Sequence, residues 1–438
     1  YQRGLFFIPR ICNEVSRRVM KKVPSKVDVV IIGAGPSGSI AAGLLVNKGY
    51  EVLVLEKQVF PRFSIGESLL PQCMAYIEEA GFMDAVQAAG LQHKNGAAFQ
   101  CRGEYEDFNF EEKFTPGWGT TFQVERGPFD KILIDEAERA GALVHYECEV
   151  VEVSVDNGIE TAPSVECRLK DDSLQTVTCK FVLDASGFGR VLPRLLDLEE
   201  PSNYPVRRTV FTHVVDNIDD SRYDREKILI SVHPDNERVW YWLIPFYDGR
   251  CSIGVVAEPG WFEQFGDSAD IDILKTAISQ DPHLRDLLRN ATFDFPVRQI
   301  AGYSCNVKKL CGDGFALLGN AGEFLDPVFS SGVTIAMHSA HLAAKVLDKQ
   351  LQGKDVDWQE DYVKPLCLGV ETFRTFVDTW YDGRLQSIIF SSAKSQEIKE
   401  MISSILAGYA WDTSNPYVAE SRRKVGVLAK VCKEAYSN

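Results

Sequence analysis

Residues 27–56, VDVVIIGAGPSGSIAAGLLVNKGYEVLVLE, decide the fold of this chain. The run VDVVII is typical of a buried parallel strand and passes directly into GAGPSG, which matches the pattern G-x-G-x-x-G. A stretch rich in alanine and leucine then predicts a helix, and YEVLVLE predicts a second strand that ends at Glu56. Together these parts indicate an α/β fold with a Rossmann-type domain that binds an adenine dinucleotide.

The residues of the turn have separate expected roles in binding. Gly33 allows the tight turn, Gly35 lets the backbone approach a pyrophosphate, and Gly38 lets the helix pack closely on the strand. The start of the helix offers free N–H groups to phosphates, which makes Ser37 a further candidate contact. Glu56, about twenty residues downstream, is placed to accept hydrogen bonds from a ribose.

Composition excludes several classes of protein. The chain has 438 residues, 45% of them hydrophobic and 25% charged, which suits two or three domains or one large composite domain. A net charge of −15 argues against a nucleic-acid partner, and no apolar run reaches the roughly 20 residues of a membrane span. The 11 cysteines are scattered without a CxxC pair, which predicts a cytoplasmic protein with reduced thiols and no metal site.

The N-terminal segment differs from the rest of the chain. The first 19 residues contain no Met, and Met20 is followed by KKVPSK and the first strand. We expect residues 1–26 to be a leader or an appended segment outside the fold, with the native start at Met20. A targeting peptide is the alternative.

Three later segments resemble the flavin-contacting segments of the FAD-dependent monooxygenase superfamily. They are KFVLDASGFGR (180–190), GDGFALLGNAGEFLDPVFSSGVT (312–334) and QVERGPFDKILIDEA (123–137). The resemblance implies FAD as the cofactor, with Arg126 near its phosphates; an amphipathic surface helix is the alternative for 123–137. Asn320 stands where that superfamily usually has an acidic residue, and its amide can still bond a ribityl hydroxyl. The further cofactor candidates are Lys57, Glu67, Ser68, Arg126, Asp184, Gly319, Asn320, Pro327, Gly332 and Val333.

The same resemblance implies a discontinuous domain organisation. The FAD-binding domain is expected in residues 27–80, 120–195 and 300–345. A substrate domain built on an inserted antiparallel sheet is expected in residues 81–119 and 196–299, where strand-like runs alternate with turns. Residues 346–438 are expected to form a helical C-terminal region.

The run WYWLIP (240–245) places two tryptophans on one face of a strand, because strand side chains alternate. By itself it predicts a hydrophobic core strand. With EKQVFPRFSIGESLLP (56–71) and DPVFSSGV (326–333), however, it resembles the phenol- and pyrrole-type branch of the flavin-dependent halogenases over almost the whole chain from Met20. The resemblance implies that Trp240, Trp242, Ile244 and Pro245 form a wall between flavin and substrate.

The resemblance also implies a halide site and a catalytic lysine. Ser331 and Gly332, with Ser330 and Val333 beside them, are the halide candidates; the alternative is that their amides bond only the flavin. Lys94 in LQHKNGAAFQC (91–101) is the residue expected to receive the oxidised halide, although Gln100 stands where some relatives have a second lysine. The alternative for Lys94 is a solvated side chain leading into a strand.

The substrate is expected to be an electron-rich aromatic, free or tethered to a carrier. Phe329 occupies the position of a Glu in tryptophan halogenases, which argues against free tryptophan. The candidate lining is aromatic and comes from the turn and the C-terminal region, with helix packing as the alternative: Phe329, Phe373, Phe376, Trp380 and Tyr381. Glu67 is expected to hold its loop by hydrogen bonds, and His93, His213, His233 and His338 are interpreted as structural.

The predicted reaction uses reduced FAD from a separate NAD(P)H-dependent reductase, together with dioxygen and chloride or bromide. Two rivals keep the fold: an aromatic hydroxylase and a geranylgeranyl-reductase-like oxidoreductase. A third is a flavoprotein that binds FAD without turnover.

Overall fold

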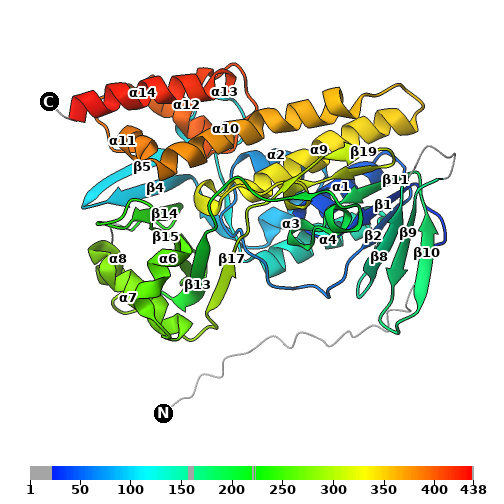
Figure 1. Cartoon of the computed structure of the whole chain (residues 1–438), viewed down its shortest axis with the longest axis horizontal. Coiled ribbons are helices and arrows are strands. Elements are labelled where there is room, and N and C mark those ends of the chain that lie inside the picture. Colours follow the sequence, from blue (N-terminus) through cyan, green and yellow to red (C-terminus); the bar gives the residue numbers. More distant parts are fainter. Residues whose placement is uncertain (1–21, 156–161, 220, 222, 437–438) are drawn as a thin grey trace, which may run out of the picture.

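The computed structural model describes residues 22–155, 162–219, 221 and 223–436 (Figure 1). Most of the expected leader, including Met20, lies outside these ranges. Val23 is 5% exposed and packs in the core, and Lys26 bridges to Thr178. The fold therefore begins by residue 23, earlier than the expected residue 27, because this short segment adds to the edge of a sheet.

The FAD-binding domain is built on a six-stranded sheet in the order β19-β20-β11-β1-β2-β7. The central strand β1 pairs in parallel with β11 and β2, and only the edge strand β19 is antiparallel. The strands are β1 (Val29–Ile32), β2 (Val52–Leu55), β7 (Leu143–His145), β11 (Phe181–Asp184), β19 (Cys311–Gly312) and β20 (Phe315–Leu317). The predicted strand–turn–helix–strand unit is thus confirmed as β1, α1 (Pro36–Val46) and β2.

Both faces of this sheet are covered, which explains the unbroken apolar run in β1. Val29 and Ile31 face α1, α4 (Arg126–Ala140) and α9 (Ser331–Leu351). Val30 and Ile32 face a three-stranded sheet of β8 (Glu149–Ser154), β9 (Ser164–Arg168) and β10 (Leu174–Thr178). A strand buried on both faces needs apolar side chains at every position.

The region expected to form the substrate domain contains a seven-stranded sheet in the order β17-β13-β16-β15-β14-β4-β5. Its strands are β4 (Gly96–Cys101), β5 (Glu104–Asn109), β13 (Arg208–Val215), β14 (Lys227–Val232), β15 (Trp240–Pro245), β16 (Arg250–Ala257) and β17 (Arg298–Ala301). One pair, β14 with β4, is parallel, so the sheet is mixed rather than purely antiparallel. Between β4 and β14 the chain passes through the FAD-binding domain. This long connection allows the two strands to pair in parallel.

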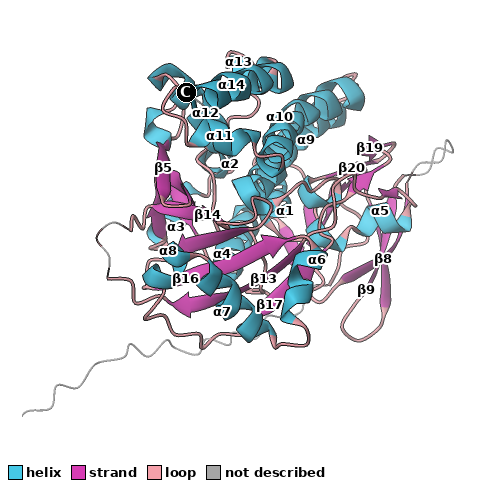
Figure 2. Cartoon of the chain, turned by 60° about the vertical axis from the view of Figure 1, so that its left-hand side comes forward, coloured by secondary structure: helices cyan, strands magenta, loops and turns pink. Residues whose placement is uncertain are grey.

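The two faces of this sheet meet different partners (Figure 2). One face packs against α7 (Asp270–Gln280) and α8 (Pro282–Leu287). The other face joins the core shared by the FAD-binding domain and the C-terminal helices. The strand β15, which carries Trp240 and Trp242, is central in the sheet, and every side chain on it is buried.

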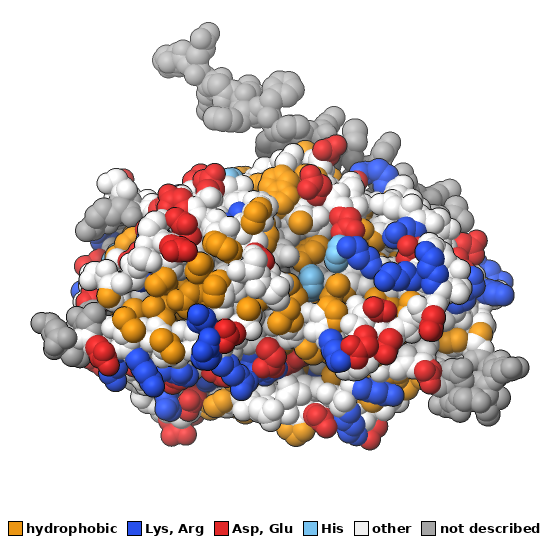
Figure 3. Space-filling view, turned by 90° about the horizontal axis from the view of Figure 1, so that it is seen from above, with side chains coloured by type: hydrophobic (Ala, Val, Ile, Leu, Met, Phe, Trp, Pro, Cys, Tyr) orange, Lys and Arg blue, Asp and Glu red, His pale blue; other side chains and the backbone are white. Residues whose placement is uncertain are grey.

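The C-terminal region is helical, as predicted, and covers the junction between the two sheets (Figure 1). Its main helices are α10 (Lys364–Tyr381), α11 (Arg384–Ile389), α12 (Gln396–Leu406), α13 (Pro416–Ala419) and α14 (Ser421–Tyr436). On the face in Figure 3, acidic, basic and hydrophobic side chains are intermixed. Within the described ranges, no helix is both long and apolar enough to cross a membrane.

Candidate active site

The glycine turn between β1 and α1 has no room for side chains at two positions. Gly33 has φ +99°, and a Cβ atom there would lie 2.6 Å from the carbonyl oxygen of Ala185. A Cβ atom on Gly38 would lie 2.0 Å from the carbonyl oxygen of Gly33, so the helix meets the turn through backbone alone. At Gly35 the nearest atom is the guanidinium of Arg62 at 3.5 Å, which leaves the backbone approachable. This cradle has the shape that a dinucleotide requires.

The substitution Gly38→Ala is expected to abolish FAD retention, because the added methyl group must separate α1 from the turn. Overpacking of this kind typically costs about 1–3 kcal/mol of stability. Flavin content after purification and thermal unfolding measure both effects. Gly260→Ala is the control, since nothing lies within 4 Å of its Cβ position. Equal flavin content in the two variants would contradict the role assigned to Gly38.

Two acidic side chains organise the loops at the ends of β2 and β11. Glu56 Oε2 accepts the backbone N–H of Ala34 at 2.9 Å, which fixes the carboxylate beside the glycine turn. Asp184 is fully buried and accepts the N–H groups of Ser186 at 2.9 Å and Leu192 at 2.7 Å. Burial raises the pKa of Asp184, while these hydrogen bonds oppose the rise. Glu56 is thus held beside the glycine turn, and Asp184 shapes the second loop.

The loop after β2 lies between the starts of two helices. Gly66 has φ +100°, and a Cβ atom there would lie 3.0 Å from Arg126 Nη1 and 3.5 Å from Val333 Cγ2. Glu67 and Ser68 follow, both buried. The loop therefore contacts both the first turn of α4 and the first turn of α9.

Two arginines share one buried carboxylate near the glycine turn. Arg126 donates to Asp130 at 2.8 and 3.0 Å, and Arg62 donates to the same carboxylate at 2.8 Å. Two cations on one anion leave a net positive charge, which suits the phosphates of a dinucleotide. Arg62, in the stretch 56–71, was not among the residues predicted from the sequence. Lys57 is instead paired with Glu149 at 2.6 Å on the surface.

The third flavin segment packs against the start of α9. Gly319 has φ +52°, and a Cβ atom there would lie 2.7 Å from Ala336. The Asn320 side-chain oxygen lies 4.0 Å from the Cβ position of Gly332, so it points to the first turn of α9. The structure thus gathers Gly319, Asn320 and Gly332 at one point.

A tight turn precedes α9 and leaves the helix without a side-chain cap. Pro327–Phe329 forms a 3-10 turn that Asp326 caps by accepting the N–H of Val328 at 3.0 Å. Ser330 is left-handed with φ 54°, and it makes no capping bond. The first N–H groups of α9, beginning at Ser331, therefore face outward with the positive end of a long helix dipole. This arrangement suits an anion such as halide, or an electron-rich flavin edge.

The tryptophans of β15 face the core shared with the FAD-binding domain. Trp240 and Trp242 are 1% and 5% exposed, and their rings lie 6.1 Å apart. Their indole N–H groups donate to Tyr381 Oη at 2.9 Å and Ser252 Oγ at 3.0 Å. Ile244 lies on the same face, whereas Tyr241 and Leu243 face the other core. The two rings are therefore held by hydrogen bonds as well as by packing.

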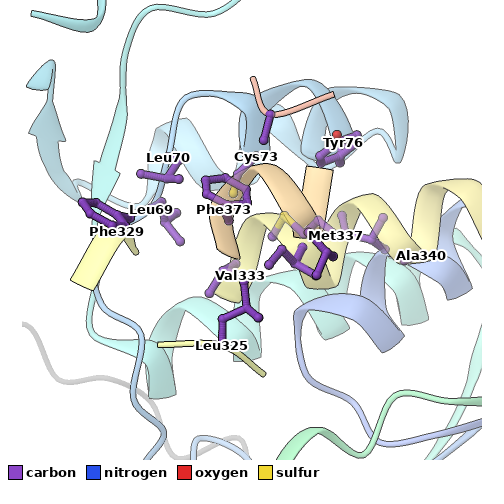
Figure 4. Packing of buried hydrophobic residues seen from close by; sticks show 14 of the residues in the cluster. Leu69, Leu70, Cys73, Tyr76, Leu325, Phe329, Val333, Met337, Ala340 and Phe373 are labelled. Atoms are coloured by element: carbon purple, nitrogen blue, oxygen red, sulfur yellow. The ribbon is translucent and has the colours of Figure 1, made fainter. Parts of the chain in front are cut away.

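Three of the expected substrate residues, Phe329, Phe376 and Trp380, form one aromatic cluster, whereas the ring of Phe373 contacts Trp411. Phe329 packs edge-on against Phe376 at 6.1 Å and Trp380 at 5.9 Å, and Trp380 also contacts Phe99. Figure 4 shows Phe329 in the same cluster of buried side chains as Leu69, which follows Glu67 and Ser68 in the loop after β2. The cluster and the loop after β2 thus share one core, and the members of the cluster are closely packed. The Tyr381 hydroxyl donates to Asp326 Oδ2 at 3.0 Å.

Lys94 is fully buried, which rules out a solvated side chain. Its ammonium donates to Ser68 Oγ at 2.8 Å and to the carbonyl oxygen of Leu69 at 2.7 Å, and it lies 5.4 Å from the centre of the Phe110 ring. Burial lowers the pKa of Lys94 from 10.5 to about 7. A buried amine without a carboxylate partner is typical of a functional site.

Sequence analysis missed the partner of Glu67. Glu67 Oε1 and His213 Nε2 lie 2.6 Å apart, and Glu67 Oε2 is buried without a partner. Burial lowers the pKa of His213, but the bond and charge of Glu67 outweigh this and raise it overall. The available signal was the alternation of β13, which places His213 on the same face as Phe211. Among the described residues, no cluster of His, Cys, Asp and Glu could hold a metal ion.

Comparison with known proteins gives the family. The FAD binding domain model matches residues 26–363. The chain is 30% identical over 426 residues to the 1H-pyrrole-2-carbonyl-[peptidyl-carrier protein] chlorinase of Pseudomonas fluorescens, covering 91% of this chain and 92% of that protein. The chain belongs to the flavin-dependent halogenase family. It is therefore an FAD-dependent enzyme of the oxidoreductase class.

Two further proteins are similar to this halogenase-family chain over most of its length. It is 30% identical to the tryptophan 2-halogenase of Chondromyces crocatus over 76% of this chain, but it spans only 63% of that protein's length. A solved flavoprotein/dehydrogenase from Cytophaga hutchinsonii is 43% identical, with a TM-score of 0.89, and covers 93% of this chain and 99% of its own. The fold class and the FAD cofactor are thus confirmed, while the individual roles of the site residues stay predictions.

Proposed function

We propose that this enzyme uses reduced FAD, dioxygen and chloride or bromide to halogenate an electron-rich aromatic of the phenol or pyrrole type. The observation that carries the proposal is the buried amine of Lys94. It lies between the flavin loop, at Ser68 and Leu69, and the aromatic ring of Phe110. An amine in that position can receive hypohalous acid and hold it near an aromatic substrate.

FAD would be held by the glycine turn, Glu56, the two arginines and the start of α9, and when reduced it activates dioxygen to oxidise the halide. The amides at the start of α9 bind the halide. Trp240 and Trp242 keep the aromatic substrate from the reacting oxygen, so that only the small halide is oxidised. Lys94 then accepts the oxidised halogen, and the cluster of Phe329, Phe376 and Trp380 holds the substrate.

The partners follow from this chemistry. A separate NAD(P)H-dependent flavin reductase supplies the reduced FAD. The substrate is free or tethered to a carrier protein, and the likeness to a pyrrole carrier-protein chlorinase supports the tethered form. All ten cysteines in the described part of the chain are unpaired thiols, which supports the cytoplasm as the compartment.

The proposal is tested by supplying the enzyme with a flavin reductase, NADH, oxygen and bromide, together with a panel of phenols and pyrroles, free and carrier-linked. Bromide-dependent brominated product, detected by its isotope pattern, is the expected result. NADH oxidation with hydroxylated product and no bromide dependence would instead support a hydroxylase. A separate anaerobic run, without reductase and NADH, tests for dehydrogenase activity. Bleaching of oxidised FAD by a substrate in that run would overturn the halogenase proposal.

The pH dependence of halogenation should reflect the protonation of Lys94. If the neutral amine receives the halogen, halogenation rises with pH around a midpoint near 7, rather than near the ordinary 10.5. The lowered pKa also means that the unfolded chain binds the extra proton between these values, so stability relative to Lys94→Met should rise with pH across the same window. Halogenation rates and urea unfolding at several pH values measure both. A flat profile through pH 7 in both would contradict the assignment.

A further inference from the structure

A chain of hydrogen bonds connects the tryptophan wall to the turn that precedes α9. The indole N–H of Trp240 donates to Tyr381 Oη at 2.9 Å. The Tyr381 hydroxyl in turn donates to Asp326 Oδ2 at 3.0 Å, and Asp326 Oδ1 accepts the N–H of Val328 at 3.0 Å. Three separate parts of the fold, β15, the end of α10 and the turn at 327–329, thus meet at one phenol.

Arg207 packs over the face of this phenol ring. Its guanidinium carbon lies 3.3 Å from the centre of the Tyr381 ring, and its Nε lies 3.5 Å from Asp326 Oδ2. Both charged side chains are buried, with Arg207 5% and Asp326 3% exposed. A buried carboxylate beside a guanidinium accepts strong, directional hydrogen bonds. The Tyr381 hydroxyl is therefore held in one orientation.

We infer that Tyr381 is a positioning residue. It fixes Trp240 relative to the turn at 327–329, which precedes the proposed halide-binding amides of α9. The inference rests on the proposed function and extends it to the C-terminal region. Without the hydroxyl, Asp326 Oδ2 keeps only its ion pair with Arg207, and the carboxylate can rotate away from the Val328 N–H. The turn would then loosen at the first amides of α9, and the indole N–H of Trp240 would lose its hydrogen bond to Tyr381.

Tyr241 provides a matched control, because it lies on β15 on the face opposite Trp240. Tyr241 is 0% exposed, and its hydroxyl donates to a single carbonyl oxygen, that of Ala277, at 2.9 Å. Tyr241→Phe and Tyr381→Phe each remove one buried hydroxyl and keep the ring. Only Tyr381→Phe breaks the connection between wall and turn.

The first readout needs no flavin chemistry. In protein labelled with ¹⁵N-tryptophan, the indole resonance of Trp240 is identified by its loss in Trp240→Phe. Tyr381→Phe should shift this resonance and speed its exchange with water, whereas Tyr241→Phe should leave it unchanged. An unmoved resonance in Tyr381→Phe would overturn the hydrogen-bond bridge.

The second readout is the halide dependence of the reaction. Tyr381→Phe should raise KM for bromide about tenfold, the size of effect expected from one buried hydrogen bond, with little change in kcat. Tyr241→Phe should match the wild type. Equal KM values in the two variants would overturn the positioning role. A wild type that oxidises no halide would overturn the proposed function itself, and the indole resonance would still decide whether the bridge exists.

Discussion

Lys94→Met should reduce aromatic halogenation by about 10²- to 10⁴-fold, the range typical of losing a positioned catalytic group. Halide oxidation should continue, because the wall and the turn before α9 are unchanged. Methionine is close in size to lysine, so the aromatic surroundings at Phe110 keep their packing. The measurement compares brominated substrate with brominated free trap, such as an electron-rich phenol added in excess.

The control for this variant is another buried lysine. Lys394 also donates to main-chain carbonyls, those of Ile389 and Ser391, but its amine is paired with Glu106. Lys394→Met removes a comparable buried cation from the C-terminal helices and should retain substrate halogenation. If Lys94→Met and Lys394→Met behave alike, Lys94 is structural. If Lys94→Met also stops bromination of the trap, its role belongs to halide oxidation.

Trp242→Phe should lower the yield of halogenated product per oxygen consumed by about tenfold and raise hydrogen peroxide correspondingly. The smaller ring leaves a gap beside Gly254, whose Cβ position lies 2.3 Å from the Trp242 ring, and it removes the bond to Ser252. Water and substrate then reach the oxidant before halide does. The full truncation Trp242→Ala should also cost about 3–5 kcal/mol of stability, so phenylalanine is the better probe.

Trp261→Phe provides the comparison for the wall variant. Trp261 packs on His233 and Phe262, on the side of the sheet that faces α7 and α8. Removing its indole should leave the product yield per oxygen unchanged. Incorporation of ¹⁸O from labelled dioxygen into the substrate should rise only in Trp242→Phe. Equal yields in the two variants would mean that Trp242 serves only as core packing.

The sequence predicted the parts of this molecule whose physics is local. The glycine turn could be recognised because close backbone contacts at Gly33 and Gly38 exclude every side chain. The shared face of Trp240 and Trp242 follows from strand alternation alone. The parallel pairing of β14 with β4 could not be predicted, since it depends on how the chain returns from the FAD-binding domain.

Partnerships between distant residues were the main omission. Glu67 and His213 are 146 positions apart, and Trp240 and Tyr381 are 141 positions apart. No local pattern links such pairs, because they meet only after both domains and the C-terminal helices have packed. Lys94 was singled out from its surrounding motif, but its complete burial and lowered pKa emerge only from the tertiary structure.

The most direct test of the central claim needs no knowledge of the natural substrate. FAD-loaded protein is reduced chemically, mixed with oxygen, and followed without halide, with chloride and with bromide, in the presence of an electron-rich trap for hypohalous acid. The proposed function predicts halogenated trap that depends on halide and falls in Trp242→Phe. Hydrogen peroxide alone, in the same amount with or without either halide, would contradict it.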